Sequence, residues 1–510
     1  MHRLGVVVFV LLCWASAAQA ACSGSGTAWN CTAGTTPAQI NSAISSASDG
    51  ATLTFAAGSY TWGGGTIISP SASKAVTLIC ATALACDVTW SGIVLTLPSG
   101  GTTSKLYRIS GFDFVSGSGN WWFQCPGGNC PETTIEQFRI DNNRWTLSGN
   151  QALLLSDNAS IHNLHGVWDH NTVNINSMTV TPWQYIGATD LSPTNGRLAS
   201  SSNMFFEDNT ITATSSSGGV GVIDGWHGMG IVWRFNTVQN ARVVLHGVPH
   251  SWGPANWEVY HNSFTNNSSA DFPDCYRHVH HQGSGTYMVW ENAFNCSGGY
   301  SGSMIVVLHY RAFQDGVPDY PCDGNGAVDG NRSPTTTYRG YPCYHQPGRD
   351  YNGAFKPMYV WRNRTAAGAK VDMEINSGGG VSPDWTDEHL VLNRDLYNAV
   401  SANAQTSATT PFNGTTGMGF GTLANRPTTC TPTPDSQDAG QGGVGYWATD
   451  GGTNWNTSNG SGNDGGLYTC SALNAWTLHY TPYTYPHPLT TVSGGGSTSL
   501  PAPTNLRVVQ

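Results

Sequence analysis

The sequence predicts an all-β protein, a right-handed parallel β-helix (solenoid) with a short N-terminal capping helix. Three observations predict it. A short segment with alternating apolar residues recurs around an asparagine along much of the chain. Only 10% of the residues are charged. Glycine is abundant, with 62 residues, which suits a chain with many turns. Copies of one strand that stack in register along an axis form a solenoid, in which the buried faces of all copies line one continuous core.

The first 20 residues are typical of a secretory signal peptide. A basic start at residues 1–3 precedes an apolar run at residues 4–14, and residues 18–20 (AQA) supply the small residues of a cleavage site. The apolar run is too short to span a membrane. We therefore expect a secreted, extracellular protein, with the β-helix domain at residues 21–490 and a flexible Gly/Ser/Pro tail at residues 491–510.

Cysteine usage agrees with export. Of the 13 cysteines, Cys13 lies in the signal peptide, and the remaining even number falls in close sequential pairs. Local pairing is the simplest disulfide set, although the sequence leaves the connectivity open. The expected pairs are Cys22/Cys31, Cys80/Cys86, Cys125/Cys130, Cys275/Cys296, Cys322/Cys343 and Cys430/Cys470.

The N-terminal part of the mature chain predicts a helix followed by a strand. Residues 36–40 (TPAQI) begin a short amphipathic helix with Ile40 and Ile44 on one face. A turn at residues 49–50 follows, and Leu53 and Phe55 alternate into the first strand. A helix in this place would cover the open, aggregation-prone end of a solenoid.

The repeat consists of seven segments that share one frame around an asparagine. Every frame has an apolar residue three positions before the asparagine, which indicates a strand with one buried face. A turn follows, and asparagine tolerates the left-handed backbone of a bend. Most frames lie 26 to 38 residues apart, about one coil of three short strands, so the asparagines should stack, each amide donating to the next. The frame asparagines are Asn143, Asn171, Asn209, Asn236, Asn262, Asn292 and Asn363. A 71-residue gap before the last frame holds an insertion at about residues 314–355.

With these frames, the chain resembles the pectate-lyase-like right-handed β-helix superfamily over about residues 35–490. The amphipathic N-terminal helix fits that resemblance, and residues 476–489 (WTLHYTPYTYPHPL) look like the closing segment of some secreted bacterial members. The resemblance implies action on a glycan along an outer face of the coil. The chain departs from well-known pectate lyases because it has only four lysines and no acidic cluster like their calcium site.

A second strand between the frames brings ionisable residues to one position. Its copies read VID at 222–224, VLH at 244–246, VHH at 279–281 and VLH at 307–309. Their last residues would form a column, and apolar neighbours in three of the four copies predict that it faces outward. The column comprises Asp224, His246, His281 and His309, with Arg242 and Arg277 four residues earlier, Arg311 two residues after His309, and Glu374 as an extension. His280 breaks the pattern: either it is a buried histidine, or the register slips by one residue there.

Three interpretations of this column stay open. A polysaccharide lyase needs a base for the C5 proton and a cation for the uronate carboxylate; His246 or His281 would be the base, and Arg242 or Arg277 the cation. A hydrolase would instead need two flanking carboxylates; Asp224 and Glu374 would lie too far apart in such a column, whereas Asp224 with Asp274 stays open. Adjacent coils could also hold a divalent cation such as calcium, or the column could be a purely structural polar ladder. Trp226 and Trp252, in expected loops, could stack on sugar rings, with Arg311 beside them.

Charge and composition limit the partners. The formal net charge is −10 and no basic stripe exists, which argues against nucleic acid. No segment after the signal peptide is long enough to span a membrane. We expect a monomer whose partner is an extracellular polysaccharide. The rival hypothesis is a non-catalytic glycan-binding or adhesin-type surface protein, which would bind glycans without turnover.

Overall fold

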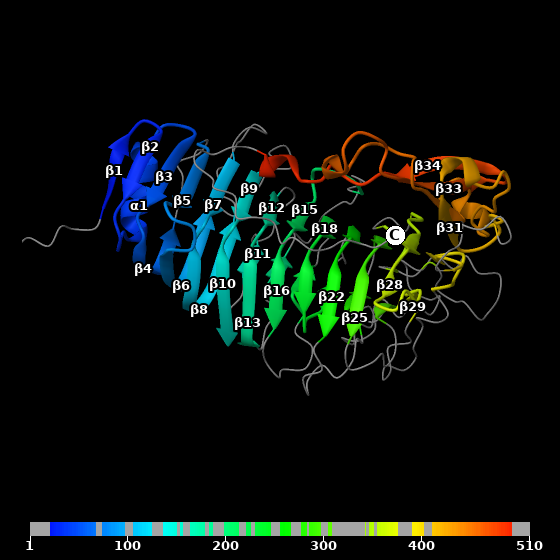
Figure 1. Ribbon diagram of the computed structural model, residues 1–510, viewed down its shortest axis with the longest axis horizontal. Helices are drawn as coiled ribbons and strands as arrows, with labels where there is room; N and C mark the ends of the chain where they lie inside the picture. The colour runs from blue at the N-terminus through cyan, green and yellow to red at the C-terminus, as the bar shows by residue number, and fades with distance from the viewer. Residues whose placement is uncertain are drawn as a thin grey trace, which may run out of the picture.

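The computed structural model describes most of the repeat region and the C-terminal part of the chain. Figure 1 shows an elongated stack of strands. The described residues are 21–67, 74–96, 106–124, 136–149, 153–156, 164–178, 183–186, 198–213, 221–225, 230–245, 255–266, 277–282, 285–296, 304–308, 342, 346–350, 354–375, 390–401 and 411–491.

The predicted parallel β-solenoid is confirmed. Its longest face is a 13-stranded sheet, here called sheet A, in which every pairing after the antiparallel β1–β2 pair is parallel. Its strands are β1 (Cys22–Ser25), β2 (Ala28–Cys31), β3 (Ala51–Phe55), β5 (Val76–Cys80), β7 (Leu106–Ser110), β9 (Glu136–Asp141), β12 (Leu164–Asp169), β15 (Met204–Glu207), β18 (Gly230–Arg234), β21 (Asn256–Tyr260), β24 (Thr286–Trp290), β27 (Met358–Trp361) and β30 (Leu396–Asn398).

Sheet B forms the second face. It begins with three long strands, and the last of these, β8, pairs through its start with β10 and through its end with β11. The long strands are β4 (Gly58–Ile67), β6 (Cys86–Thr96) and β8 (Asp113–Gln124). Sheet B continues as β10 (Arg144–Gly149), β13 (Thr172–Met178), β16 (Thr210–Ala213), β19 (Thr237–Gln239), β22 (Ser263–Asn266), β25 (Ala293–Cys296) and β28 (Arg364–Thr365).

The third face, here called face C, starts at the end of β8. It first comprises β11 (Leu153–Ser156), β14 (Trp183–Ile186) and β17 (Ile223–Gly225). A single bridge between Gly221 and Arg242 then leads to a four-stranded sheet. These strands are β20 (Val243–Leu245), β23 (Val279–Gln282), β26 (Ile305–Leu308) and β29 (Met373–Ile375).

The predicted helix covers the N-terminal end. Helix α1 (Pro37–Ser46) begins after Thr36, which forms a capping box with Gln39. Ile40 and Ile44 are fully buried against the first coils, as their spacing predicts. This confirms the expected capping helix, whose apolar face covers core residues that would otherwise meet water.

The asparagine frames stack as predicted. The apolar residue three positions before each asparagine points into the core and is fully buried, as at Trp168, Trp233 and Val360. The amide nitrogen of Asn209 donates to Oδ1 of Asn236 at 3.0 Å. The same side-chain bond links every successive pair of frames from Asn143 to Asn363.

One detail of the turn differs from the expectation. The left-handed backbone belongs to the residue before each frame asparagine, for example Asp208 with φ 57° and His261 with φ 56°. The asparagine itself can therefore turn its amide inward, where each Oδ1 also accepts a backbone N–H of the preceding frame. The ladder thus satisfies buried polar groups that the bend removes from the sheets.

A separate sheet follows the last coil. It contains the parallel pair β31 (Met418–Gly421) and β32 (Gly445–Ala448), and then the antiparallel strands β33 (Gly466–Ala472) and β34 (Ala475–Tyr480). Short 3-10 helices are η3 (Leu423–Asn425), η4 (Ser436–Asp438), η5 (Thr457–Asn459) and η6 (Pro488–Thr490). Aromatic residues of this sheet and of sheet A form a second core outside the solenoid, with Trp290, Trp361 and Trp447 at its centre.

After β34 the chain runs back along the solenoid as an extended strap, residues 481–490, coloured orange to red in Figure 1. Buried charges on the outer side of sheet A hold it. Arg234 pairs with Glu207 and donates to the backbone carbonyls of Tyr483 and Thr484 at 2.7 and 2.9 Å. The backbone N–H of His487 donates to the Glu207 carboxylate at 2.8 Å.

Glu258 makes the stability of this packing dependent on pH. Its carboxylate accepts the Tyr480 hydroxyl and the Ala199 N–H, but burial raises its pKa from the ordinary value near 4.5 to about 7. A carboxyl whose pKa is raised by folding stabilises most below pH 4.5, and this contribution is lost as pH rises through 7. Glu258→Gln should remove that loss, worth about 3 kcal/mol, between pH 5 and pH 8.

Thermal unfolding of the wild type and of Glu258→Gln from pH 5 to pH 8 checks this expectation. The difference between their melting temperatures should shift in favour of the variant as pH rises. The exposed carboxylate Glu374 provides the control, since Glu374→Gln should keep the wild-type slope. Parallel pH profiles for the wild type and Glu258→Gln would contradict the assignment.

Three predicted disulfides are present, and all join near neighbours: Cys22–Cys31, Cys80–Cys86 and Cys430–Cys470. Cys296 is also disulfide-bonded, whereas Cys125, Cys130, Cys275, Cys322 and Cys343 lie outside the described residues. Within the described ranges, no helix is long and apolar enough to cross a membrane.

Candidate functional site

Face C carries the residues that the sequence singles out, but in a different register. His281 pairs with Leu245 and with Val307 in the neighbouring strands. The expected alignment of His281 with His246 and His309 is therefore wrong by one residue. The side chains of a strand alternate between its two faces, so this shift turns His281 inward.

His281 is fully buried inside the solenoid. Its ring lies 3.5 Å from the Tyr287 ring and 5.7 Å from that of Trp257, measured between centroids. The sequence was ambiguous here because Val243 and Val244 are both apolar, as are Val306 and Val307. Either member of each pair could be the inward residue, and the packing selects Val243 and Val307.

His280 takes the outward position instead. It pairs with Val244 on one side and with Val306 on the other, and Val306 pairs with Glu374. Asp224 also points outward, because its neighbour Ile223 is a core residue. His280 and Asp224 are only 7% and 6% exposed, so a ligand on face C can reach only a small part of each side chain.

The two predicted arginines lie on the same side of this position, at the corner that precedes it in two successive coils. Arg242 stands two residues before Val244 and is half-buried. Arg277 forms the left-handed corner before β23, with φ 54°. His278, which follows Arg277, points into the core, where burial and the nearby Arg242 charge lower its pKa to about 4. The remaining predicted residues, His246, His309, Arg311, Trp226 and Trp252, lie outside the described residues.

A second set of residues, five of the seven ionisable, was missed by the sequence analysis and lies on the turn between sheets A and B. These residues immediately precede the frame asparagines and share the left-handed backbone. We call them the turn column: Asn142, His170, Asp208, Phe235, His261, Glu291 and Arg362. The sequence did contain a sign of this column, because six of the seven residues directly before the frame asparagines are polar.

At one end of the turn column, an acid and a base meet the strap. His170 bonds Asp169 at 3.0 Å, and although burial opposes it, this carboxylate raises the pKa of His170 to about 9. Burial and the adjacent Glu207 charge raise the pKa of Asp208 to about 7. The Tyr485 hydroxyl donates to Asp208 at 2.8 Å. This group can exchange protons near neutral pH.

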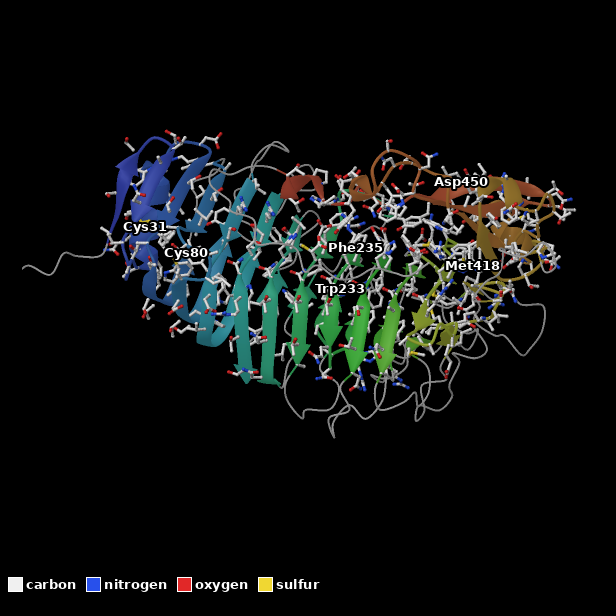
Figure 2. The ribbon with its side chains drawn as sticks, in the orientation of Figure 1. Cys31, Cys80, Trp233, Phe235, Met418 and Asp450 are labelled. Carbon is white, nitrogen blue, oxygen red and sulfur yellow. A yellow bond between two sulfur atoms is a disulfide. The ribbon has the colours of Figure 1, made fainter. Side chains whose placement is uncertain are left out.

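The rest of the column is tied to its neighbours. Phe235, labelled in Figure 2, stacks between Tyr485 and His261, with ring centroids 3.8 and 4.8 Å away. His261 and Arg362 bind Glu291 at 3.0 and 2.7 Å. Although burial opposes them, these two neighbours lower the pKa of Glu291 to about 2. These contacts give the column a structural role in fixing the strap.

The described residues include no group of three or more His, Cys, Asp or Glu side chains arranged to hold a metal ion. On its described strands, face C offers the outward His280, with Arg242 and Arg277 at the corner before it and Asp224 two strands away, and the turn column offers Asp208 and His170. No protein-family model matches this chain, and no curated protein matches its sequence.

Proposed function

We propose that this protein is a secreted carbohydrate-active protein of the pectate-lyase-like right-handed β-helix type, a polysaccharide lyase acting on an extracellular glycan along face C. One observation carries the proposal. The corrected register brings His280 to the outward side of face C, with Arg242 and Arg277 at the neighbouring corners. An imidazole and guanidinium groups on one face are the groups that uronate elimination requires.

In the proposed reaction, neutral His280 removes the proton at C5 of a uronate. The electron pair of that C–H bond forms the C4–C5 double bond, and the C4–O glycosidic bond breaks. The leaving oxygen takes a proton from water, and the protonated His280 returns its proton to the hydroxide that remains. Arg242 or Arg277 pairs with the uronate carboxylate and stabilises the negative charge that develops beside C5. An imidazole is a suitable base near neutral pH.

Hydrolysis fits the described residues less well. Asp224 and Glu374 are the outward carboxylates on the described strands of face C, and they lie on β17 and β29. Four inter-strand steps of about 4.8 Å separate these strands. The resulting distance of about 19 Å is larger than the roughly 5 to 9.5 Å that separates the two catalytic carboxylates of a glycosidase.

The test is a screen of the full chain on uronate-containing and neutral glycans, reading the ultraviolet absorbance of the unsaturated product. His280→Ala should lower the rate by roughly 10²- to 10⁴-fold. His170→Ala, a partly exposed histidine on the turn column, is the control and should retain activity. Products formed equally well by His280→Ala would overturn the assignment.

Binding without products would favour the alternative, a non-catalytic glycan-binding surface protein. One observation favours that alternative: on five successive strands of sheet B (β13, β16, β19, β22 and β25), most outward residues carry uncharged hydroxyl or amide groups. This surface can hold sugars without acting on them.

A further inference from the structure

The outer side of sheet B is chemically uniform over five successive coils. The inward residues of these strands, such as Val173, Phe264 and Phe294, are fully buried. The alternate residues point outward and are exposed or half-buried. We call these ten outward residues the sheet B platform: Thr172, Asn174, Thr210, Thr212, Thr237, Gln239, Ser263, Thr265, Ala293 and Asn295.

The platform is regular in two directions. β13, β16, β19, β22 and β25 pair in parallel with no register shift, so like positions repeat about every 4.8 Å along the solenoid axis. Alternate residues within a strand are about 6.7 Å apart. The buried aromatic and branched residues beneath fix the backbone, and the polar groups therefore form a preorganised grid. Figure 1 shows these strands side by side.

The platform carries no charge. Nine of its ten side chains have a hydroxyl or amide group, and the last is Ala293. Among the described residues, charges stand at its two ends, where Arg144 pairs with Asp113 before β13 and Arg364 begins β28, and in the turn column, which borders the start of its strands. A partner that matches this surface is uncharged and rich in hydroxyl groups, because a carboxylate placed here would lose water without gaining a cation.

We propose that the sheet B platform binds a neutral polysaccharide, with extended chains aligned along the solenoid axis and about one sugar unit on each coil. The ligand class rests on the proposed function, which makes the protein a glycan-active one, but the platform is distinct from face C. A protein partner fits less well, because the platform lacks the Trp, Tyr and Arg anchors on which protein interfaces depend. Each hydrogen bond is weak in water, and affinity accumulates over several coils.

The two sites would divide the work between them. Face C would act on uronates, while the platform would keep the protein on the neutral chains among which those uronates lie. Attachment raises the local concentration of the substrate at face C without any new contact to it.

The experiment is an adsorption isotherm of the full chain on amorphous cellulose, a neutral β-glucan, and on a calcium polygalacturonate gel. We expect saturable adsorption to cellulose that persists at high salt. The double variant Thr212→Val and Thr265→Val, which removes two hydroxyl groups at nearly constant shape, should weaken adsorption about five- to tenfold. The matched control changes Thr52 and Thr54 to valine on the outer side of sheet A, and should adsorb like the wild type.

The catalytic proposal for face C and the binding proposal for the platform can be tested independently. His280→Ala should lose turnover and keep adsorption, whereas the platform variant should keep turnover of short soluble oligosaccharides and lose adsorption. The platform proposal is overturned if the Thr212 and Thr265 changes leave adsorption unaltered, or if the protein adsorbs only to the anionic gel. It is also overturned if the platform slows ice growth and binds no glycan, which would make frozen water its ligand.

Discussion

Arg234→Met is expected to lower the free energy of unfolding by about 3 to 5 kcal/mol, because it leaves the Glu207 carboxylate buried without its cation. Both side chains are fully buried. Arg234 also donates to the Tyr260 hydroxyl at 2.9 Å and to two carbonyls of the strap. One substitution therefore breaks an ion pair and the attachment of a segment about 250 residues away.

Chemical denaturation with amide hydrogen exchange measures this effect. The amides of the strap should lose protection at denaturant concentrations where the solenoid amides remain protected. Adding Glu207→Gln should recover part of the lost stability, because the neutral side chain can still accept the His487 N–H. Lys370→Ala, which breaks a partly exposed pair with Asp372, should cost about 1 kcal/mol or less. If Arg234→Met and Lys370→Ala lowered the free energy of unfolding equally, burial would not explain the importance of the Arg234–Glu207 pair.

Asn236→Leu should cost about 4 kcal/mol, the second large effect. The Asn236 amide donates to Asn262 Oδ1 and to the carbonyls of Phe206 and Arg234. Its Oδ1 accepts both the backbone and the side-chain N–H of Asn209. Leucine cannot replace these bonds, and each buried group that loses its partner costs about 1 to 3 kcal/mol.

Two further asparagine or glutamine positions sharpen this test. Gln239→Leu removes an amide from the same coil, but on the outer side of sheet B, and should change stability by no more than about 0.5 kcal/mol. Asn363→Leu, at the last frame of the ladder, should cost less than Asn236→Leu, because the Asn363 amide donates to the Val289 carbonyl, whereas the Asn236 amide donates to three acceptors. Urea unfolding midpoints give all three values. A loss at Asn363 as large as that at Asn236 would contradict the ladder explanation.

Patterns with a single physical solution were predictable from the sequence. The residue three positions before each frame asparagine had to be a core residue, since a strand with one buried face repeats its apolar side chains with period two. The frame spacing implied one asparagine in each coil, and the ladder follows from the stacking. Ile40 and Ile44 marked the capping helix in the same way, because four residues complete about one helical turn.

Face C shows where such reasoning reached its limit. Two consecutive valines at positions 243 and 244 satisfy the apolar pattern in either register, and only packing against the other faces selects the inward one. That choice sends His281 into the core and His280 outward. The turn column was overlooked for a related reason, because its residues differ in type and share only a backbone conformation.

The sequence by itself determined the solenoid, its inward residues and the asparagine ladder, because each depends on short-range periodicity that repeats from coil to coil. The tertiary structure alone decided the register of face C, the separate C-terminal sheet and the attachment of the strap. Those features depend on contacts between residues hundreds of positions apart, such as Arg234 with Thr484. No local pattern encodes such pairs, because their energy arises only when burial brings the two segments together.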